Sequence, residues 1–181
     1  MARNQSLPAL WLLSDERNAH LLERTLGTAR TPLGFVYRHY HLPDPERHDT
    51  FQRLARVARA RGHLVVLADS ALTAREWGAD GIYGAPLELA PRRRDLLTLA
   101  TAHDMREIAQ ANRVGADAVM LSPVFPTRSH PGAPTLGTSR FRTLARHAQM
   151  PVIALGGMNA DTARRLNWSR WAAIDGISGA R

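Results

Sequence analysis

Short apolar runs alternate with amphipathic segments along almost the whole chain. Eight of these runs are short and are bounded by polar or glycine-containing turns, which is typical of buried strands. The predicted strands are residues 9–14, 34–39, 64–68, 81–83, 96–101, 118–122, 152–155 and 172–174. The segments between them carry apolar residues at helical spacing. The predicted helices are residues 16–29, 45–61, 71–77, 104–114, 139–147 and 160–166.

This alternation predicts an α/β fold in which parallel strands are joined by crossover helices. Eight strands favour a closed (βα)8 TIM barrel, and an open doubly wound sheet is the alternative. A repeated joint supports helix-to-strand units, because WGAD at residues 77–80 and VGAD at residues 114–117 each precede a predicted strand. In each joint the glycine stands where a helix ends and a left-handed residue is needed. The joints lie away from the carboxyl ends of the strands and therefore say nothing about a reaction.

The predicted barrel is shortened. We expect one domain over residues 1–181, whereas a full barrel typically has about 250 residues. The connection over residues 84–95 contains two prolines and no helical stripe, and only residues 175–181 follow the last predicted strand. Outer helices are therefore expected to be reduced after strand 4 and at the C-terminus. A homodimer is one way to cover the apolar surface that this leaves.

Composition narrows the class of protein. The 181 residues include no cysteine, which excludes disulfides, thiolate metal sites and a cysteine nucleophile. The net charge is +8 and every basic side chain other than histidine is arginine, spread mainly along the predicted helices. The single run, residues 92–94, has no interleaved aromatic residues, so nucleic acid binding is not expected. No apolar run reaches the length of a membrane span or of a signal-peptide core, so we expect a cytoplasmic protein.

Two neighbouring strand ends carry the candidate chemistry. The apolar run AVMLSPVF at residues 118–125 stops at a loop rich in proline, hydroxyl and basic residues. One βα unit later, PVIAL at residues 151–155 stops at Gly156 and Gly157. Strands that end in glycine- and hydroxyl-rich loops are typical of α/β barrels that hold a phosphorylated small molecule. A plain tight turn is the alternative interpretation of the two glycines.

These residues resemble the thiamine phosphate synthase / TenI family. The resemblance extends from LWLLSDE at residues 10–16 to the last predicted strand. It is densest over GADAVMLSPVFPTRSHPGAPTLG at residues 115–137 and MPVIALGGM at residues 150–158. These segments are similar to the family's GPVFPT-x-[TS]-K-x-G loop and its PVxAIGG[IM] strand. The resemblance implies a (βα)8 barrel with small phosphorylated substrates. The family's reactions join a pyrimidine diphosphate to a thiazole phosphate or tautomerise the thiazole phosphate.

The resemblance implies a diphosphate and metal site after strands 2 to 4. Arg38 matches the arginine of the family's Q-x-R-x-K motif, whose glutamine and lysine are replaced, and strand alternation aims Arg38 inward. Asp69 matches the aspartate of the family's N-D pair, which implies Mg²⁺ as a cofactor with Asp69 as a metal ligand. The N-cap of the following helix is the alternative role for Asp69. Only Glu88 stands near the position of the second acidic ligand.

Further matches follow strands 5 and 6. His103 matches the histidine of S-x-H-[ST], for which the resemblance implies proton transfer in the tautomerase branch. A structural histidine is the alternative. Thr127 and Ser129 match the two hydroxyl residues of the sixth loop, and His130 replaces its lysine. These three residues are expected to contact the diphosphate, or else to form a solvated loop.

The last matches concern the thiazole phosphate. Gly156 and Gly157 match the phosphate-binding glycines, and Asp175 replaces a serine that helps to cradle the phosphate. At ~4 Å and an effective dielectric constant of about 20, two like unit charges repel by about 4 kcal/mol. A phosphate beside Asp175 therefore needs an intervening arginine or metal.

Together these matches predict a thiamine phosphate synthase-like enzyme that releases pyrophosphate. The alternatives are a thiazole tautomerase that uses His103 and a non-catalytic ligand-binding barrel.

Overall fold

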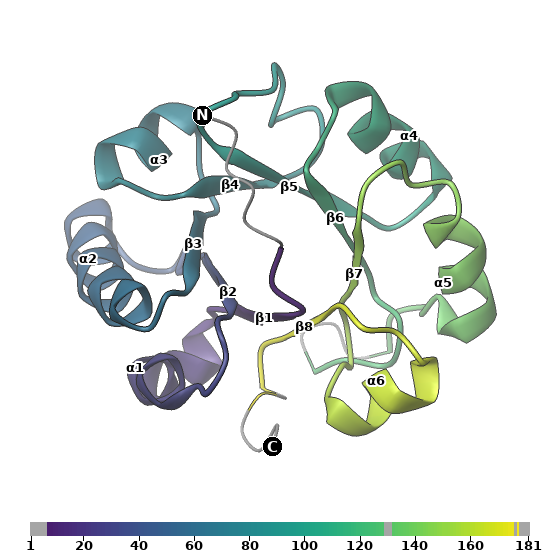
Figure 1. The fold of residues 1–181 in the computed structure, drawn as a ribbon, viewed down its shortest axis with the longest axis horizontal. Helices are drawn as coiled ribbons and strands as arrows, with labels where there is room; N and C mark the ends of the chain where they lie inside the picture. The colour runs from purple at the N-terminus through teal and green to yellow at the C-terminus, as the bar shows by residue number, and fades with distance from the viewer. Residues whose placement is uncertain (1–6, 129–131, 176, 178–181) are drawn as a thin grey trace.

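The structure, a computed structural model, describes residues 7–128, 132–175 and 177. Its centre is a closed barrel of eight parallel strands in the order β1-β2-β3-β4-β5-β6-β7-β8 (Figure 1). The strands are β1 Leu10–Leu13, β2 Gly34–Tyr37, β3 Leu64–Leu67, β4 Gly81–Gly84, β5 Leu97–Ala102, β6 Ala118–Leu121, β7 Val152–Ala154 and β8 Trp171–Ala173. The predicted TIM barrel is therefore confirmed, and the open sheet is wrong because β1 pairs with β8.

The helices surround this barrel (Figure 1). They are the 3-10 helix η1 Glu16–Asn18, α1 Ala19–Thr28, α2 Asp44–Ala60, α3 Ala71–Trp77, α4 Met105–Val114, α5 Gly137–Ala145 and α6 Ala160–Leu166. Most boundaries lie within two residues of those predicted. The segment predicted as one helix over residues 16–29 begins instead as a 3-10 turn. There Asp15 caps the backbone and Asn18 closes a capping box.

The predicted reductions in the outer ring are also confirmed. The chain between β4 and β5 forms turns instead of a helix. No helix follows β8 among the described residues, so the outer face of β8 lies between α6 and α1 without a helix of its own (Figure 1).

Two apolar layers hold the barrel together. Side chains that alternate along the strands fill its interior, including Trp11, Leu13, Val36 and Met120, all with 0% exposure. The intervening side chains face outward and pack under the helices. Filling the interior leaves no pore and restricts polar groups to the ends of the strands.

Both predicted joints form as expected. Gly78 and Gly115 end α3 and α4 in the left-handed conformation, with φ of 74° and 71°. The aspartate two residues after each glycine then accepts a hydrogen bond from a backbone amide of an earlier strand. Asp80 accepts from the amide of Val65 at 2.9 Å. Asp117 accepts a hydrogen bond from the amide of Thr98 at 2.8 Å and pairs with Arg92. The joints therefore link the strands at the end of the barrel opposite the candidate site.

None of the helices in the described ranges is long and apolar enough to cross a membrane.

The Asp117→Ala substitution should lower the free energy of unfolding by about 1–3 kcal/mol, because it leaves the Thr98 amide without its charged acceptor. Urea denaturation measures the change. Asp49→Ala is the matched control, since the Asp49 side chain on α2 is 87% exposed, and it should change the free energy by less than about 0.5 kcal/mol. Equal effects of the two substitutions would contradict the structural role of the joint.

Candidate active site at the carboxyl ends of the strands

Because all eight strands are parallel, their carboxyl ends form one rim of the barrel. The predicted site residues in the described part of the chain lie on this rim or in the loops that leave it. They are Arg38 after β2, Asp69 after β3, His103 after β5, Thr127 after β6, Gly156 and Gly157 after β7, and Asp175 after β8. Ser129 and His130 lie outside the described residues.

Arg38 is fixed at the rim by the end of β1. Its backbone amide donates to the Ser14 hydroxyl at 2.7 Å, and its Nε donates to the Ser14 carbonyl at 2.8 Å. One terminal nitrogen pairs with Asp15 at 3.1 Å. Hydrogen bonding from Arg17 lowers the pKa of Asp15 against the opposing effect of burial, and Arg38 adds to this lowering. Among the described residues nothing accepts from the other terminal nitrogen of Arg38, NH1, which leaves two N–H groups for a ligand.

His39 turns away from the mouth. Its φ of 39° is left-handed, and the side chain is 3% exposed. The imidazole stacks on Tyr37 at 4.9 Å, and Nδ1 lies 2.9 Å from the Ser14 hydroxyl. Burial lowers the pKa of His39 to about 4, with the charge of nearby His41 adding to the effect. A neutral His39 therefore supports the backbone turn that presents Arg38.

Arg47, which sequence reasoning missed, links the ends of β2 and β3. It lies in the first half of α2 and is 6% exposed. Its Nε donates to the Arg38 carbonyl at 3.0 Å, and NH2 donates to the Ala68 carbonyl at 3.0 Å. NH1 pairs with the Asp69 carboxylate at 2.6 Å. The guanidinium thus holds two rim loops in register.

The Asp69 carboxylate is already occupied. One oxygen accepts from Arg47 and the other from the Ser70 amide at 2.7 Å. Burial alone would raise the pKa of Asp69, but hydrogen bonds from Arg47, Ser70 and Thr73 outweigh it, and the net pKa lies below the usual value. The alternative N-cap role for Asp69 is wrong, because Ser70 caps α3 by accepting from Thr73.

The described residues do not fit a resident Mg²⁺ ion. Mg²⁺ needs free oxygen ligands in octahedral geometry, and both Asp69 oxygens are engaged. Glu88, the expected substitute ligand, directs one oxygen toward the Ala85 amide at 3.4 Å. No group of three or more acidic or histidine side chains within the described ranges is arranged to hold a metal.

His103 is held by a carboxylate. Its Nδ1 lies 2.8 Å from Glu107 in the first turn of α4, and its backbone amide donates to the same oxygen at 2.6 Å. The side chain remains 55% exposed. An imidazole that is oriented by a carboxylate through one nitrogen has the other nitrogen available for proton transfer.

The diglycine turn lies directly against the loop after β6. A Cβ atom on Gly156 would lie 2.7 Å from Cα of Pro123, and one on Gly157 would lie 2.5 Å from the Pro126 carbonyl oxygen. Their φ values of 93° and 63° are also left-handed. Packing therefore already requires glycine here. The described residues accept no hydrogen bond from either glycine amide, so both amides also suit an anion.

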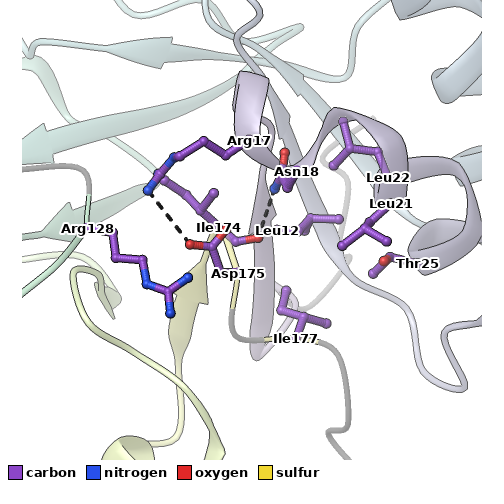
Figure 2. Close-up of a pocket in the computed structure, with 10 residues that line it drawn as sticks. All are labelled: Leu12, Arg17, Asn18, Leu21, Leu22, Thr25, Arg128, Ile174, Asp175 and Ile177. Carbon is purple, nitrogen blue, oxygen red and sulfur yellow. Dashed lines mark hydrogen bonds and ion pairs between the residues drawn. The ribbon is translucent and has the colours of Figure 1, made fainter.

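Asp175 lines a cavity of about 240 Å³ together with two arginines, Arg17 and Arg128. Arg17 lies 3.8 Å from its carboxylate, and Arg128 lines the same cavity (Figure 2). Asn18 links the ends of β1 and β8 beside this cavity, because its side-chain amide nitrogen donates to the carbonyls of Leu13 and Ile174 at 3.0 and 2.8 Å. The two cations reduce the repulsion that Asp175 alone would exert on an anionic ligand.

Comparison with known proteins assigns the family. The profile of the family described as thiamine monophosphate synthase matches residues 14–179. The chain belongs to the thiamine monophosphate synthase family.

Three curated relatives of this family member are named thiamine-phosphate synthase. The Pyrococcus furiosus protein is 28% identical over 75% of the chain, and the match covers 67% of that relative. The Lactococcus lactis protein is 28% identical over 74% of the chain, and the match covers 64% of that relative. The Chloroflexus aurantiacus protein is 30% identical over 78% of the chain, and the match covers 67% of that relative. The chain therefore spans about two thirds of the relatives' length.

Solved structures show the same fold. A thiamine phosphate pyrophosphorylase from Pyrococcus furiosus superposes with a TM-score of 0.74 at 23% identity, over 94% of this chain and 88% of the other. A thiamine phosphate pyrophosphorylase from Bacteroides thetaiotaomicron has a TM-score of 0.60 at 14% identity, over 93% of this chain and 83% of the other.

Two residues of this thiamine monophosphate synthase family member escaped sequence analysis although a signal was available. Arg47 occupies the helical face that continues with Phe51 and Leu54, all of which are buried, so its spacing predicts an inward arginine. Asn18 stands three residues after Asp15, which is the spacing of a capping box. Neither pattern reveals which groups these side chains bind.

His39→Asn should reduce the acid sensitivity of this family member. Because the folded pKa of His39 lies below its unfolded value, the unfolded chain binds the proton first. The free energy of unfolding is therefore lost as the pH falls from about 6.5 to about 4, by about 3 kcal/mol in total. Asparagine tolerates the left-handed backbone and does not titrate.

Urea denaturation at several pH values between 7 and 4 should show a smaller decline for His39→Asn than for wild type. His20→Asn, at an exposed position on α1, should keep the wild-type decline. An unchanged decline in His39→Asn would show that His39 is not a buried neutral imidazole.

Proposed function

We propose that this chain catalyses a thiamine phosphate synthase reaction in the cytoplasm. Hydroxymethylpyrimidine diphosphate and a thiazole phosphate would be joined, with release of pyrophosphate. The observation that carries the proposal is the collection of anion-binding groups on one rim: the Arg38 guanidinium, the free amides of the diglycine turn, and Arg128. The curated relatives named thiamine-phosphate synthase support the product, and the family resemblance implies the two substrates.

The first step breaks the bond between the pyrimidine methylene carbon and the diphosphate oxygen. The bonding electron pair leaves with the diphosphate, and the methylene carbon becomes a cation. Arg38 is suited to stabilise the growing negative charge, because its backbone is fixed at the rim and its NH1 group has no acceptor among the described residues. Thr127 follows β6, which stands opposite β2 in the barrel order. Preorganised donors of this kind stabilise a transition state more than a ground state.

The second step forms the carbon–nitrogen bond. The lone pair of the thiazole nitrogen attacks the methylene cation, and the positive charge moves to the thiazolium ring. The thiazole phosphate would bind between the amides of Gly156 and Gly157 and the arginines around Asp175. Arg17 and Arg128 offset the carboxylate that replaces the family's serine. Holding both substrates at one rim replaces an encounter in solution with a positioned attack.

Arg38→Met should lower kcat/KM for thiamine phosphate formation by about 10²–10³-fold, as expected for the loss of one donor to developing charge. The assay follows thiamine phosphate from the two purified substrates. Arg140→Met, at an exposed position on α5, is the control and should retain wild-type activity.

Thermal unfolding of both arginine variants separates lost chemistry from lost structure. Coupling by folded Arg38→Met at nearly the wild-type rate would contradict this placement of the diphosphate.

Thiazole tautomerisation is the second candidate. It is favoured by the His103–Glu107 pair, which has the geometry of an oriented base, and by the engagement of Asp69 with Arg47. The reaction moves a proton between two positions of the thiazole ring and needs no diphosphate or metal.

If the chain is a tautomerase, His103→Ala should lower the isomerisation rate by about 10²–10⁴-fold, because proton transfer loses its base. His147→Ala, whose side chain is exposed on the outer surface, should not change the rate. NMR of the thiazole phosphate measures the isomerisation. Coupling activity that survives in His103→Ala, without isomerisation in wild type, would reject the tautomerase and favour the synthase.

A further inference from the structure

We propose that Arg47 occupies the place of a metal ion beside Asp69, so that this site carries a built-in guanidinium cation instead of Mg²⁺. The inference concerns the site of the proposed function, but its test measures metal binding. It can therefore fail while the proposed reaction stands, and it can hold if the reaction proves wrong.

The hydrogen bonds of the Asp69–Arg47 pair support this assignment. Each nitrogen group of the guanidinium has a single acceptor, at 3.0, 2.6 and 3.0 Å, and these acceptors come from the β2 and β3 ends. The Asp69 carboxylate directs one oxygen to Arg47 and the other to Ser70. A metal at this carboxylate would compete with these donors for the same two oxygens.

The surroundings of Arg47 make displacement unfavourable. Its side chain is 7% exposed, and its Cζ lies 5.2 Å from the centre of the Trp77 ring and 5.7 Å from that of Tyr40. Removing the partner of a buried charge is strongly destabilising, because the remaining charge is neither hydrated nor paired. A divalent ion that took Asp69 would strand Arg47 in this way.

Electrostatic repulsion acts in the same direction. A metal bound to the Asp69 oxygens would lie within a few ångströms of the guanidinium, and like charges at such distances repel strongly in a partly buried site. Arg47 therefore acts as a positioning residue that neutralises Asp69 and fixes the carbonyl of Arg38.

The test compares Mn²⁺ affinity among four proteins by electron paramagnetic resonance titration, since Mn²⁺ takes the same oxygen ligands as Mg²⁺. Wild type and Asp69→Asn should bind Mn²⁺ equally weakly, within about twofold. Arg47→Met should free the Asp69 carboxylate and bind Mn²⁺ at least about tenfold more tightly than wild type, because a competing cation is removed. The double variant Arg47→Met/Asp69→Asn should lose this gain.

Binding to wild type at least about tenfold tighter than to Asp69→Asn would overturn the proposal. So would an unchanged Mn²⁺ affinity in folded Arg47→Met. If the variants fail to fold, a measurement on the wild-type protein alone still tests the proposal. In its ¹⁵N NMR spectrum Mn²⁺ should not selectively broaden the amide signals of Asp69 and Ser70, and selective broadening there would overturn the proposal.

Discussion

The hydrogen-bonded contact between Arg47 and two strand ends is the constraint on which the rest of the rim depends. The Nε, NH1 and NH2 groups of this buried guanidinium each donate to a separate acceptor. Any other orientation of the side chain would therefore lose at least one hydrogen bond. Arg47 places the Arg38 backbone from one side, and Ser14 places it from the other. The position of the Arg38 backbone thus follows from two fixed contacts, and it presents the guanidinium from a defined point on the rim.

Charged groups alternate around the rim from β8 to β3. Asp175 pairs with Arg17, Arg17 with Asp15, Asp15 with Arg38, and Arg47 with Asp69. Three carboxylates and three guanidinium groups cancel in formal charge, so this arc of the rim is nearly neutral despite the net charge of +8. The proposed anion binding then relies on directed donors, namely Arg128 and the N–H groups of Arg38 and the diglycine turn that have no acceptor among the described residues. Directed donors favour a phosphate of defined position over a general attraction to polyanions.

Periodicity predicted the fold closely because strands that face a filled interior and a helix layer must be apolar on both sides, and few other patterns look the same. It also predicted the missing outer helices, since two prolines exclude a helical stripe between β4 and β5. The chemistry was harder to predict. The matched motif gave Asp69 as a metal ligand, but its partner Arg47 lies 22 residues earlier and meets it only through the packing of α2.

The diglycine turn shows a related limit. Sequence analysis weighed a phosphate site against a tight turn as alternatives; the structure shows the tight turn, and the phosphate site stays a prediction. The close approach of Pro123 and Pro126 requires glycine, and the same turn leaves two amides without an acceptor among the described residues. Close backbone contacts between distant segments leave no mark in the composition of either segment, so only the fold reveals why the glycines are needed.

The central claim is that this rim binds a diphosphate with its own cations and amides. Calorimetric titration of inorganic diphosphate into the protein, in buffer containing EDTA, tests it most directly. The account predicts binding to wild type that is greatly weakened when Arg38 is replaced by methionine. Binding that requires added Mg²⁺, or that is indifferent to Arg38, would contradict it.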